Sequence, residues 1–407
     1  MTWATEPGAR NVLPPPSRKA CIFCGGAGTP FFEIPAIPID VSALFRDADE
    51  ARGAPMGRLA LVFCERCGGI FNSAWDPAAL SYDTRYENSL DASAVFGQYA
   101  EQLARRLTST YATGNGSVVE IGCGQGRFLQ EICRLSGSRG AGFDPSYHGP
   151  PRDGSVSVER RLFKAADAEG ARLIICRHVL EHLEDPSLLI TELAGIRQDG
   201  PDTVVYFEVP NAAIILDGAL PWDLIYPHVS YFTLESLTGL FRRSGFHILD
   251  AGPAYSGQFL YVEATAASDA ADDSEPPDTD AVQRLVASFP AMHRSIVDRW
   301  ARYLEDTRRA GNRIAFWGAG AKGVTFLNLV PGARAIDCVI DLNPRKRDSF
   351  VPGTGQRVSD PEALKLIRPK VVVTLNPIYV PEIRERLSEM GIRATIVTEP
   401  SDAPRLQ

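Results

Sequence analysis

Two stretches of the chain alternate short apolar strands with amphipathic helices, and each opens with a strand that runs into a glycine-rich turn. The first extends from SVVEIG (117–122) to QFLYVEATA (258–266), and the second from RIAFWG (313–318) to RATIVTE (393–399). Strands that alternate with helices form mostly parallel sheets with helices on both faces. The pattern therefore predicts two α/β units.

Changes in composition divide the 407 residues further. The start of the chain is polar and Pro-rich. An acidic stretch with two prolines and no large apolar residue separates the two α/β units, as linkers do. A long helix is expected from Ala281 to Arg309. We expect a flexible tail (1–18), a cysteine-bearing module (19–80), a first α/β domain (81–266), a linker (267–281) and a smaller second α/β domain (282–400).

Charge and hydropathy exclude several classes of protein. The formal net charge of −8 disfavours broad nucleic-acid binding, which needs a basic surface. The start lacks the apolar core of a secretory signal, and no apolar run is long enough to span a membrane. We expect a cytoplasmic protein without nucleic-acid or membrane partners. Its oligomeric state stays open.

Two Cys-x-x-Cys pairs, each followed by glycine, precede the first α/β unit. Thiols stay reduced in the cytoplasm, so paired cysteines there favour a metal over disulfides, with redox pairs as the alternative. Four thiolates close the tetrahedral shell of Zn²⁺ and leave no open position, so the site would be structural. The expected ligands are Cys21, Cys24, Cys64 and Cys67. The other four cysteines lie in apolar segments and are expected to be core thiols.

The first glycine turn, VVEIGCGQG, could hold either NAD or S-adenosylmethionine. Gly122, Gly124 and Gly126 let the backbone approach a ligand closely. Glu120 ends the strand before the glycines, where it can accept a bond from an amino group. Asp144 ends the following strand, where it can bind ribose hydroxyls. These acids favour S-adenosylmethionine.

Four motifs in order, VVEIGCGQGRFL, RHVLEHLEDP, EVPN and PHVSYFT, resemble class I S-adenosylmethionine-dependent methyltransferases. The leading cysteine module and the trailing FWGAGAKG make the chain similar to the three-domain sugar-nucleotide C-methyltransferases of deoxysugar pathways. The resemblance implies a seven-stranded methyltransferase sheet, a small N-terminal zinc module and a second, Rossmann-like C-terminal domain. It also implies an NDP-linked 4-keto-6-deoxysugar as substrate. A base would remove its C3 hydrogen, and the enolate carbon would take the methyl group.

The resemblance also assigns catalytic residues. Its motif near YHEHFSYFS reads IYPHVSYFT here, so His228 is the expected base and Pro227 replaces a glutamate. Tyr231 is expected to relay a proton or bind the oxyanion. The other expected contributors are His182, which lines the cleft, His178, which lines it on the cofactor side, and Tyr86, which closes over it. Binding of a metal by the two histidines of RHVLEHL is disfavoured, because no Glu follows in the register of zinc proteases.

The second glycine turn, FWGAGAKG, has dinucleotide-binding spacing at Gly318, Gly320 and Gly323, and Asp341 ends the next strand. Read alone, it suggests NAD. Within the resemblance, it would instead hold the substrate's pyrophosphate, with Lys322 adding positive charge.

Three alternatives therefore accompany the C-methyltransferase. They are an O- or N-methyltransferase acting on a sugar or natural product, an NAD-dependent oxidoreductase, and a noncatalytic zinc-scaffolded binding protein.

Overall fold

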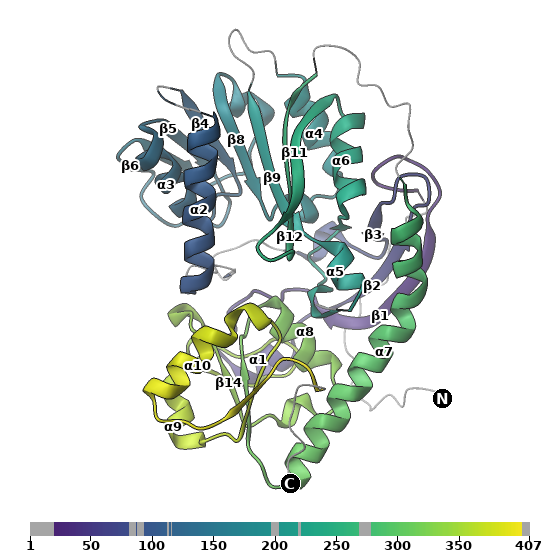
Figure 1. Ribbon diagram of the computed structural model, residues 1–407, viewed down its shortest axis with the longest axis vertical. Helices are drawn as coiled ribbons and strands as arrows, with labels where there is room; N and C mark the ends of the chain where they lie inside the picture. The colour runs from purple at the N-terminus through teal and green to yellow at the C-terminus, as the bar shows by residue number, and fades with distance from the viewer. Residues whose placement is uncertain are drawn as a thin grey trace.

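The computed structural model describes residues 20–80, 87, 93–111, 114, 116–196, 203–218, 221–267 and 278–400. The predicted tail, Tyr86 and most of the predicted linker lie outside these ranges. Two α/β domains lie at opposite ends of the molecule, with a small antiparallel sheet beside them (Figure 1). Among the described helices, none is long and apolar enough to cross a membrane.

The first α/β domain is built on an eight-stranded sheet in the order β11-β12-β9-β8-β4-β5-β7-β6. The central strands are parallel, and β12 runs antiparallel between β9 and β11. This is the predicted seven-stranded methyltransferase sheet with a two-residue edge strand added. The strands are β4 (Ser117–Ile121), β5 (Arg139–Phe143), β6 (Arg152–Asp153), β7 (Val156–Glu159), β8 (Ala171–Arg177), β9 (Val204–Pro210), β11 (Phe246–Ala254) and β12 (Phe259–Ala266).

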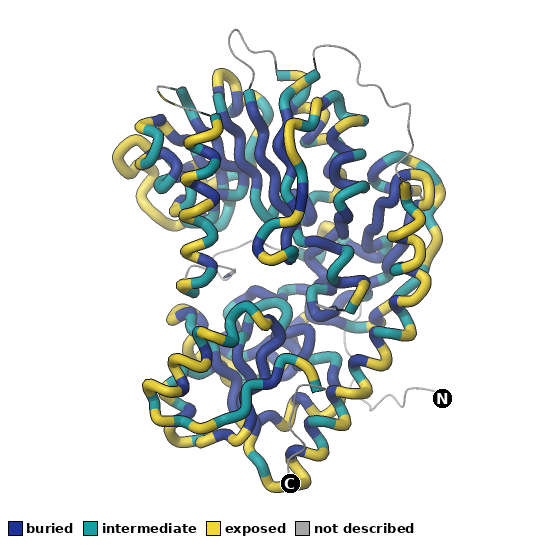
Figure 2. The backbone as a smooth tube through the Cα atoms, viewed as in Figure 1, coloured by how far each residue is buried: buried dark blue, intermediate teal, exposed yellow. Residues whose placement is uncertain are grey.

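Helices cover both faces of this sheet, so its central strands are dark blue in Figure 2. Leu173 and Ile175 of β8 pack with α2 and α3, whereas Ile174 and Cys176 pack with α4 and α6. The two-residue alternation of a strand explains this division. The helices are α2 (Ala94–Tyr111), α3 (Arg127–Ser136), α4 (Pro186–Ala194) and α6 (Leu234–Arg243).

The sequence determines where these helices begin. At α4, the Asp185 side chain accepts hydrogen bonds from the backbone N–H groups of Ser187 and Leu188, and Pro186 occupies the first helical position. Helix α3 begins after Gly126 and ends at Gly137, both with positive φ. Helix α3 therefore starts directly at the glycine turn.

The second α/β domain has a parallel five-stranded sheet in the order β15-β14-β13-β16-β17. Its strands are β13 (Ile314–Trp317), β14 (Cys338–Ile340), β15 (Val358–Ser359), β16 (Val371–Thr374) and β17 (Thr395–Val397). Its helices are α8 (Ala321–Leu329), α9 (Leu364–Ile367) and α10 (Val380–Glu389). The predicted second domain is therefore present.

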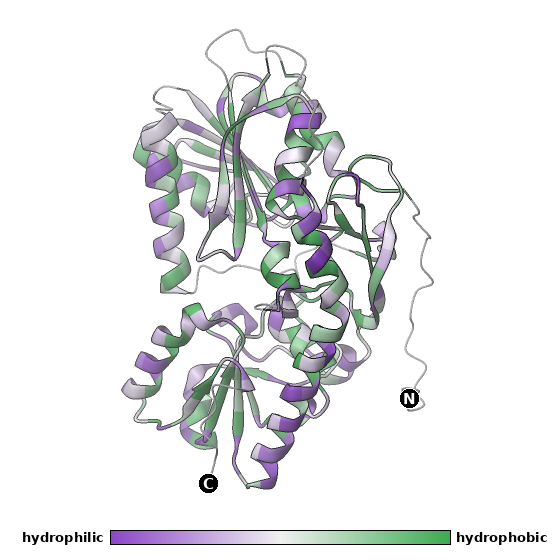
Figure 3. Ribbon diagram, turned by 45° about the vertical axis from the view of Figure 1, so that its right-hand side comes forward, coloured by the Kyte–Doolittle hydropathy of each residue, from purple (hydrophilic) through white to green (hydrophobic). Residues whose placement is uncertain are grey.

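The predicted long helix is α7 (Asp280–Arg309), which extends from the cysteine module to the second α/β domain (Figure 1). Apolar and polar residues alternate along it, as the green and purple bands of Figure 3 show. Its buried residues recur every three or four positions, so that one stripe faces inward. Helix α7 thereby joins both parts of the molecule.

The cysteine module contains β1 (Thr29–Pro38), β2 (Met56–Phe63), β3 (Ile70–Asn72) and the short helix α1 (Ala48–Arg52). Its antiparallel sheet is completed by β10 (Ser230–Tyr231), which comes from the loop after β9. That loop also carries α5 (Ala212–Leu216) and the 3₁₀ turn η4 (Pro221–Asp223). The module and the first α/β domain therefore share a sheet.

Candidate functional site

The glycine turn after β4 leaves room for a ligand at one position. Gly122 has a φ of +67°, and a Cβ there would lie 2.1 Å from Cγ2 of Val179. Gly124 also has a positive φ, but a Cβ there would meet no atom within 4 Å. Gly122 therefore allows the close packing of the turn. Gly124 marks its open side, where a ligand can approach the backbone.

The two predicted acids lie on either side of this turn. Glu120 is buried near the carboxyl end of β4. Asp144 accepts hydrogen bonds from the N–H of Gly124 at 2.8 Å and from the N–H and hydroxyl of Ser146 at 2.8 and 2.6 Å. Asp144 therefore holds the turn in shape, and a carboxylate has lone pairs left for ribose hydroxyls. The open glycine turn and the two carboxylates fit the amino and ribose groups of S-adenosylmethionine.

His178 lies just beyond β8 with a φ of +56°, so it and His182 are not on one helix. Only the 3₁₀ turn η3 (Leu180–His182) separates β8 from α4. The His178 Nε2 lies 3.1 Å from Glu208 and its Nδ1 lies 3.7 Å from Glu181. Burial disfavours the imidazolium, but the two carboxylates outweigh it and raise the pKa of His178 to about 9. His178 is therefore cationic near neutral pH.

Glu208 of the EVPN motif is a site residue that the sequence analysis missed. It is fully buried, with Arg177 Nε at 3.2 Å and the Tyr206 hydroxyl donating at 2.9 Å, while the Tyr99 hydroxyl also donates. Burial would raise its pKa, but Arg177 and His178 lower it to about 2. An acid inside the apolar strand VVYFEVP was the available signal.

His228 lies in a buried loop between η4 and β10. Its ring centroid is 4.9 Å from that of His182 and 5.9 Å from that of Tyr231. One ring nitrogen of each histidine and one carboxylate oxygen of Glu181 lie within 4.8 Å of one another. The loop after β9 therefore brings His228 beside Glu181 and His182 of η3, beyond the carboxyl end of β8.

The environment keeps His228 neutral. Burial lowers its pKa well below the usual value, and the nearby His182, His178 and Lys322 lower it further. The Nδ1–H of His182 donates to the Pro227 carbonyl at 3.0 Å, because a carbonyl can only accept. A neutral imidazole in this position can accept a proton.

The Tyr231 hydroxyl donates a hydrogen bond within its own loop. The hydroxyl donates to the Ile225 carbonyl at 3.0 Å, and burial raises its pKa. The oxygen can still accept a hydrogen bond. The remaining predicted catalytic residue, Tyr86, lies outside the described residues.

The second glycine turn resembles the first in its bonding. The N–H of Gly318 donates to the Ile340 carbonyl at 2.7 Å, and the N–H of Ala319 donates to Asp341 at 2.8 Å. A Cβ on Gly323 would lie 2.0 Å from the Gly318 carbonyl oxygen. These glycines therefore serve close packing between the turn and α8.

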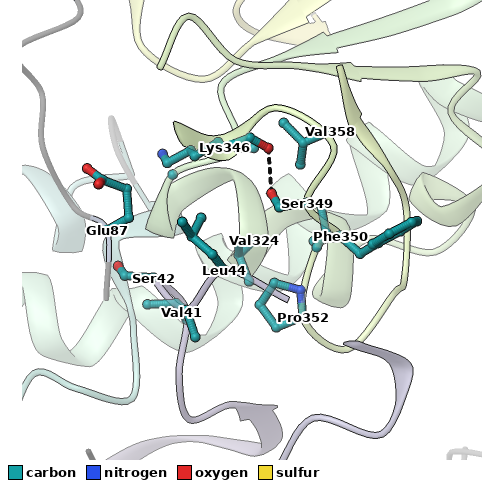
Figure 4. Close-up of a pocket in the computed structure, with 14 residues that line it drawn as sticks. Val41, Ser42, Leu44, Glu87, Val324, Lys346, Ser349, Phe350, Pro352 and Val358 are labelled. Atoms are coloured by element: carbon teal, nitrogen blue, oxygen red, sulfur yellow. Dashed lines mark hydrogen bonds between the residues drawn. The ribbon is translucent and has the colours of Figure 1, made fainter. Parts of the chain in front are cut away.

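Two lysines lie near this turn, and each pairs with a carboxylate. The Lys322 Nζ pairs with Asp223 of η4 at 2.9 Å. The Lys346 Nζ instead lies 3.8 Å from where a Cβ on Gly320 would be and 3.2 Å from Asp341. Lys346 and Gly320 line a pocket together with Ser42 of the cysteine module (Figure 4). The basic run PRKR after β14 was the only sequence signal for it.

The four predicted zinc ligands form one cluster. Their sulfur atoms lie within 4.8 Å of one another, with Cys21 to Cys67 at 3.6 Å and Cys24 to Cys64 at 3.7 Å. A tetrahedral zinc site with Zn–S bonds of about 2.3 Å has sulfur separations of roughly 3.8 Å. These sulfur separations fit Zn²⁺ and are too long for disulfides.

The two cysteine turns have matching backbones. The Gly25 N–H donates to the backbone carbonyl of Cys21, and the Gly68 N–H donates to the backbone carbonyl of Cys64, both at 2.8 Å. Both glycines have a φ of +69°. Each turn therefore uses the predicted glycine to present its pair of thiols from a left-handed backbone.

The cysteine cluster also belongs to the core of the first α/β domain. The Phe23 ring packs edge-on against Phe232 with centroids 5.5 Å apart. In β3, the N–H of Asn72 donates to the Val229 carbonyl at 2.8 Å, next to His228. The cysteine module therefore supports the loop that carries His228.

The carboxyl edge of the large sheet faces the second α/β domain (Figure 1). The side-chain amides of Gln258 and Asn376 exchange two hydrogen bonds, at 3.0 and 2.8 Å. The Tyr255 hydroxyl donates to that of Tyr379 at 3.0 Å. These bonds hold the β11–β12 hairpin against the second α/β domain, and the pair of Lys322 and Asp223 holds the loop after β9 against the beginning of α8.

Comparisons with known proteins agree with this arrangement. Residues 92–251 match a methyltransferase domain, and residues 278–397 match the C-methyltransferase C-terminal domain. The C-methyltransferase NovU of Streptomyces niveus is 26% identical over 374 residues, which are 85% of this chain and 86% of NovU.

Solved structures with similar folds include two methyltransferases. The magnesium protoporphyrin IX methyltransferase of Synechocystis PCC 6803 is 16% identical, with a TM-score of 0.35 over 44% of this chain and 86% of its own. The N,N-8-amino-8-demethyl-D-riboflavin dimethyltransferase of Streptomyces davawensis is 23% identical, with a TM-score of 0.33 over 42% of this chain and 55% of its own. Because methyltransferase models match both α/β domains, the chain is an S-adenosylmethionine-dependent methyltransferase.

Proposed function

We propose that the protein methylates carbon 3 of an NDP-linked 4-keto-6-deoxysugar through an enolate. The observation that carries this proposal is a neutral, buried His228 at the sheet edge that faces the glycine turn of the second domain. When bound, S-adenosylmethionine supplies a methyl group to a nucleophilic carbon. The relative NovU, a C-methyltransferase by name, supports carbon as the acceptor.

His228 takes the C3 proton of the substrate. The ketone at C4 acidifies this hydrogen, and the electron pair of the broken C–H bond moves onto the enolate oxygen. The cationic His178 and Lys322 lie close enough to affect His228 electrostatically. Their positive charges stabilise the enolate as it forms. Tyr231 and His182 fill the space beside His228 and hold its ring.

The methyl donor is assigned to the turn after β4. Gly124 offers the open approach, Gly122 and Gly126 shape the turn, and the acids Glu120 and Asp144 would bind the amino and ribose groups. His178 remains a proposed neighbour of the cofactor. The four cysteines would hold one structural Zn²⁺.

The sugar nucleotide is assigned to the glycine turn before α8. We place its pyrophosphate there because the turn opens a helix and Lys346 lies beside it. Lys346 is a further proposed source of positive charge beside Lys322; each lysine pairs with one carboxylate, Lys322 with Asp223 and Lys346 with Asp341.

Changing Lys346 to Met should raise the KM for the sugar nucleotide about 10-fold, because loss of one charged contact costs about 1.4 kcal/mol or more. The affinity for S-adenosylhomocysteine should not change. The matched control is Lys365→Met, an exposed lysine that pairs with Glu362 at 2.6 Å. Steady-state kinetics with both substrates check this. An unchanged KM in the Lys346 variant would remove this lysine from the substrate site.

Proton exchange tests the proposed reaction itself. In D₂O with S-adenosylhomocysteine present, the protein should exchange the C3 hydrogen of an NDP-4-keto-6-deoxysugar, because enolate formation does not need the methyl donor. Mass spectrometry of the recovered sugar should show one added deuterium. An O- or N-methyltransferase has no reason to catalyse this exchange, so its absence alongside turnover would contradict the proposal.

A further inference from the structure

Glu181 lies at the centre of the histidine cluster, although the sequence analysis did not assign it a role. It belongs to η3, and its side chain is 1% exposed. One of its oxygens lies within 4.8 Å of a ring nitrogen of His182 and of His228, and another contact places it 3.7 Å from His178. Its backbone carbonyl accepts the N–H of Val229 at 2.8 Å, which ties η3 to the catalytic loop.

These imidazoles are the main groups that can offset the negative charge of the buried Glu181 carboxylate. Among the residues that the structure describes, no donor makes a hydrogen bond of good geometry to either of its oxygens. A buried carboxylate in this state is costly unless positive charge lies nearby. The surrounding ring nitrogens are therefore the groups that its charge stabilises when they carry protons.

His228 needs such a negative charge when it acts as a base. Besides burial, His182, His178 and Lys322 lower the pKa of His228, so all three oppose its protonation. Glu208, the other buried carboxylate nearby, faces His178 instead, with 3.1 Å between them. The sequence position beside His228 is Pro227, which carries no charge.

We propose that Glu181 is the positioning residue for His228, and that it supplies from η3 the carboxylate that Pro227 cannot supply. The inference rests on the proposed function. When the C3–H bond of the sugar breaks, its electron pair stays on the substrate as the enolate and the proton moves to a ring nitrogen of His228. Glu181 stabilises the imidazolium formed in this step and holds its ring toward the substrate.

Comparison of the variants Glu181→Gln and Glu181→Asp separates the effect of the side chain's charge from the effect of its size. The Gln variant keeps the size but loses the charge, so kcat should fall on the order of 10- to 100-fold with KM and S-adenosylhomocysteine affinity unchanged. The Asp variant should recover most of this loss. Because a lost negative charge lowers the pKa of a nearby base, the acid limb of kcat/KM should move to lower pH in the Gln variant. The control is Glu192→Gln, an exposed glutamate on α4.

Proton exchange distinguishes failure of this inference from failure of the proposed function. If the wild type exchanges the C3 hydrogen and the Gln variant exchanges it equally fast, Glu181 has no such role. Equal losses in the Gln and Asp variants, with an unmoved acid limb, would also overturn it. If the wild type shows no exchange, the proposed function itself fails.

A metal titration provides a further check for a variant that folds poorly. Co²⁺ is added to wild-type protein whose cysteine site already holds zinc. Absence of a second, non-thiolate cobalt site supports a proton-transfer role for the cluster. A stoichiometric site that activates the enzyme and disappears in Glu181→Asp would show that the cluster is a metal centre, which overturns the inference.

Discussion

Changing His228 to Gln should lower turnover by about two orders of magnitude or more, which is the usual contribution of a general base. Glutamine has hydrogen-bonding groups and a similar length, but it cannot accept the C3 proton. The affinity for S-adenosylhomocysteine should stay nearly the same, because the turn after β4 does not include this residue. Single-turnover kinetics and calorimetric titration measure the two effects.

The matched control is His247→Gln, a change on the exposed face of β11. It should leave turnover and cofactor affinity unaltered. Because His228 is buried, the thermal midpoint of its variant is measured as well, so that unfolding is not mistaken for a chemical effect. A folded variant with unchanged turnover would exclude His228 as the base.

Changing Cys64 to Ser should remove zinc and lower the stability of the cysteine module and of the first α/β domain. Structural zinc sites contribute folding free energy directly. A loss of about 3 kcal/mol or more would lower the thermal midpoint by roughly 10 °C. Activity should also fall, because β3 pairs with β10 and Asn72 binds the Val229 carbonyl beside His228. Metal analysis and thermal unfolding check the result.

Cys338→Ser is the control for this change, since it also replaces a buried thiol but lies in the second α/β domain. It should keep one zinc per chain. If Cys64→Ser also retained full zinc content, the four cysteines would not form the proposed metal site.

The fold was accessible from the sequence because each element has a local cause. Continuous apolar runs mark the buried central strands, glycines with positive φ mark both glycine turns, and paired cysteines mark the cysteine cluster. The antiparallel pair β11 and β12 also follows from one contiguous stretch of sequence. Each of these features is marked within a single segment, even where, as in the cysteine cluster, two distant segments then come together.

The features that could not be predicted from the sequence depend on contacts between residues that are far apart in the chain. Nothing local indicates that Ser230 and Tyr231 complete the sheet of the cysteine module. Lys322 lies within the glycine motif, yet its Nζ pairs with Asp223 of the other domain, and Lys346 approaches the turn from a separate loop.

Two carboxylates beside the histidines, Glu181 and Glu208, could not be identified from the sequence for a related reason. Glu181 stands between the histidines of RHVLEHL and Glu208 lies in EVPN, and only the packing shows that both acids face His178. The segment RHVLEHL is not a continuous helix, because His178 adopts a left-handed backbone and the helix proper begins at Pro186. The tight turn brings Glu181 between the histidines.

Transfer of a ¹³C-labelled methyl group tests the central claim most directly. The protein is incubated with S-adenosylmethionine labelled at the methyl carbon and with an NDP-4-keto-6-deoxysugar, and the product is examined by NMR. We expect the label to show one-bond coupling to a sugar carbon that has lost its hydrogen. A label attached to oxygen or nitrogen, or recovered entirely in unreacted donor, would contradict methylation of a carbon.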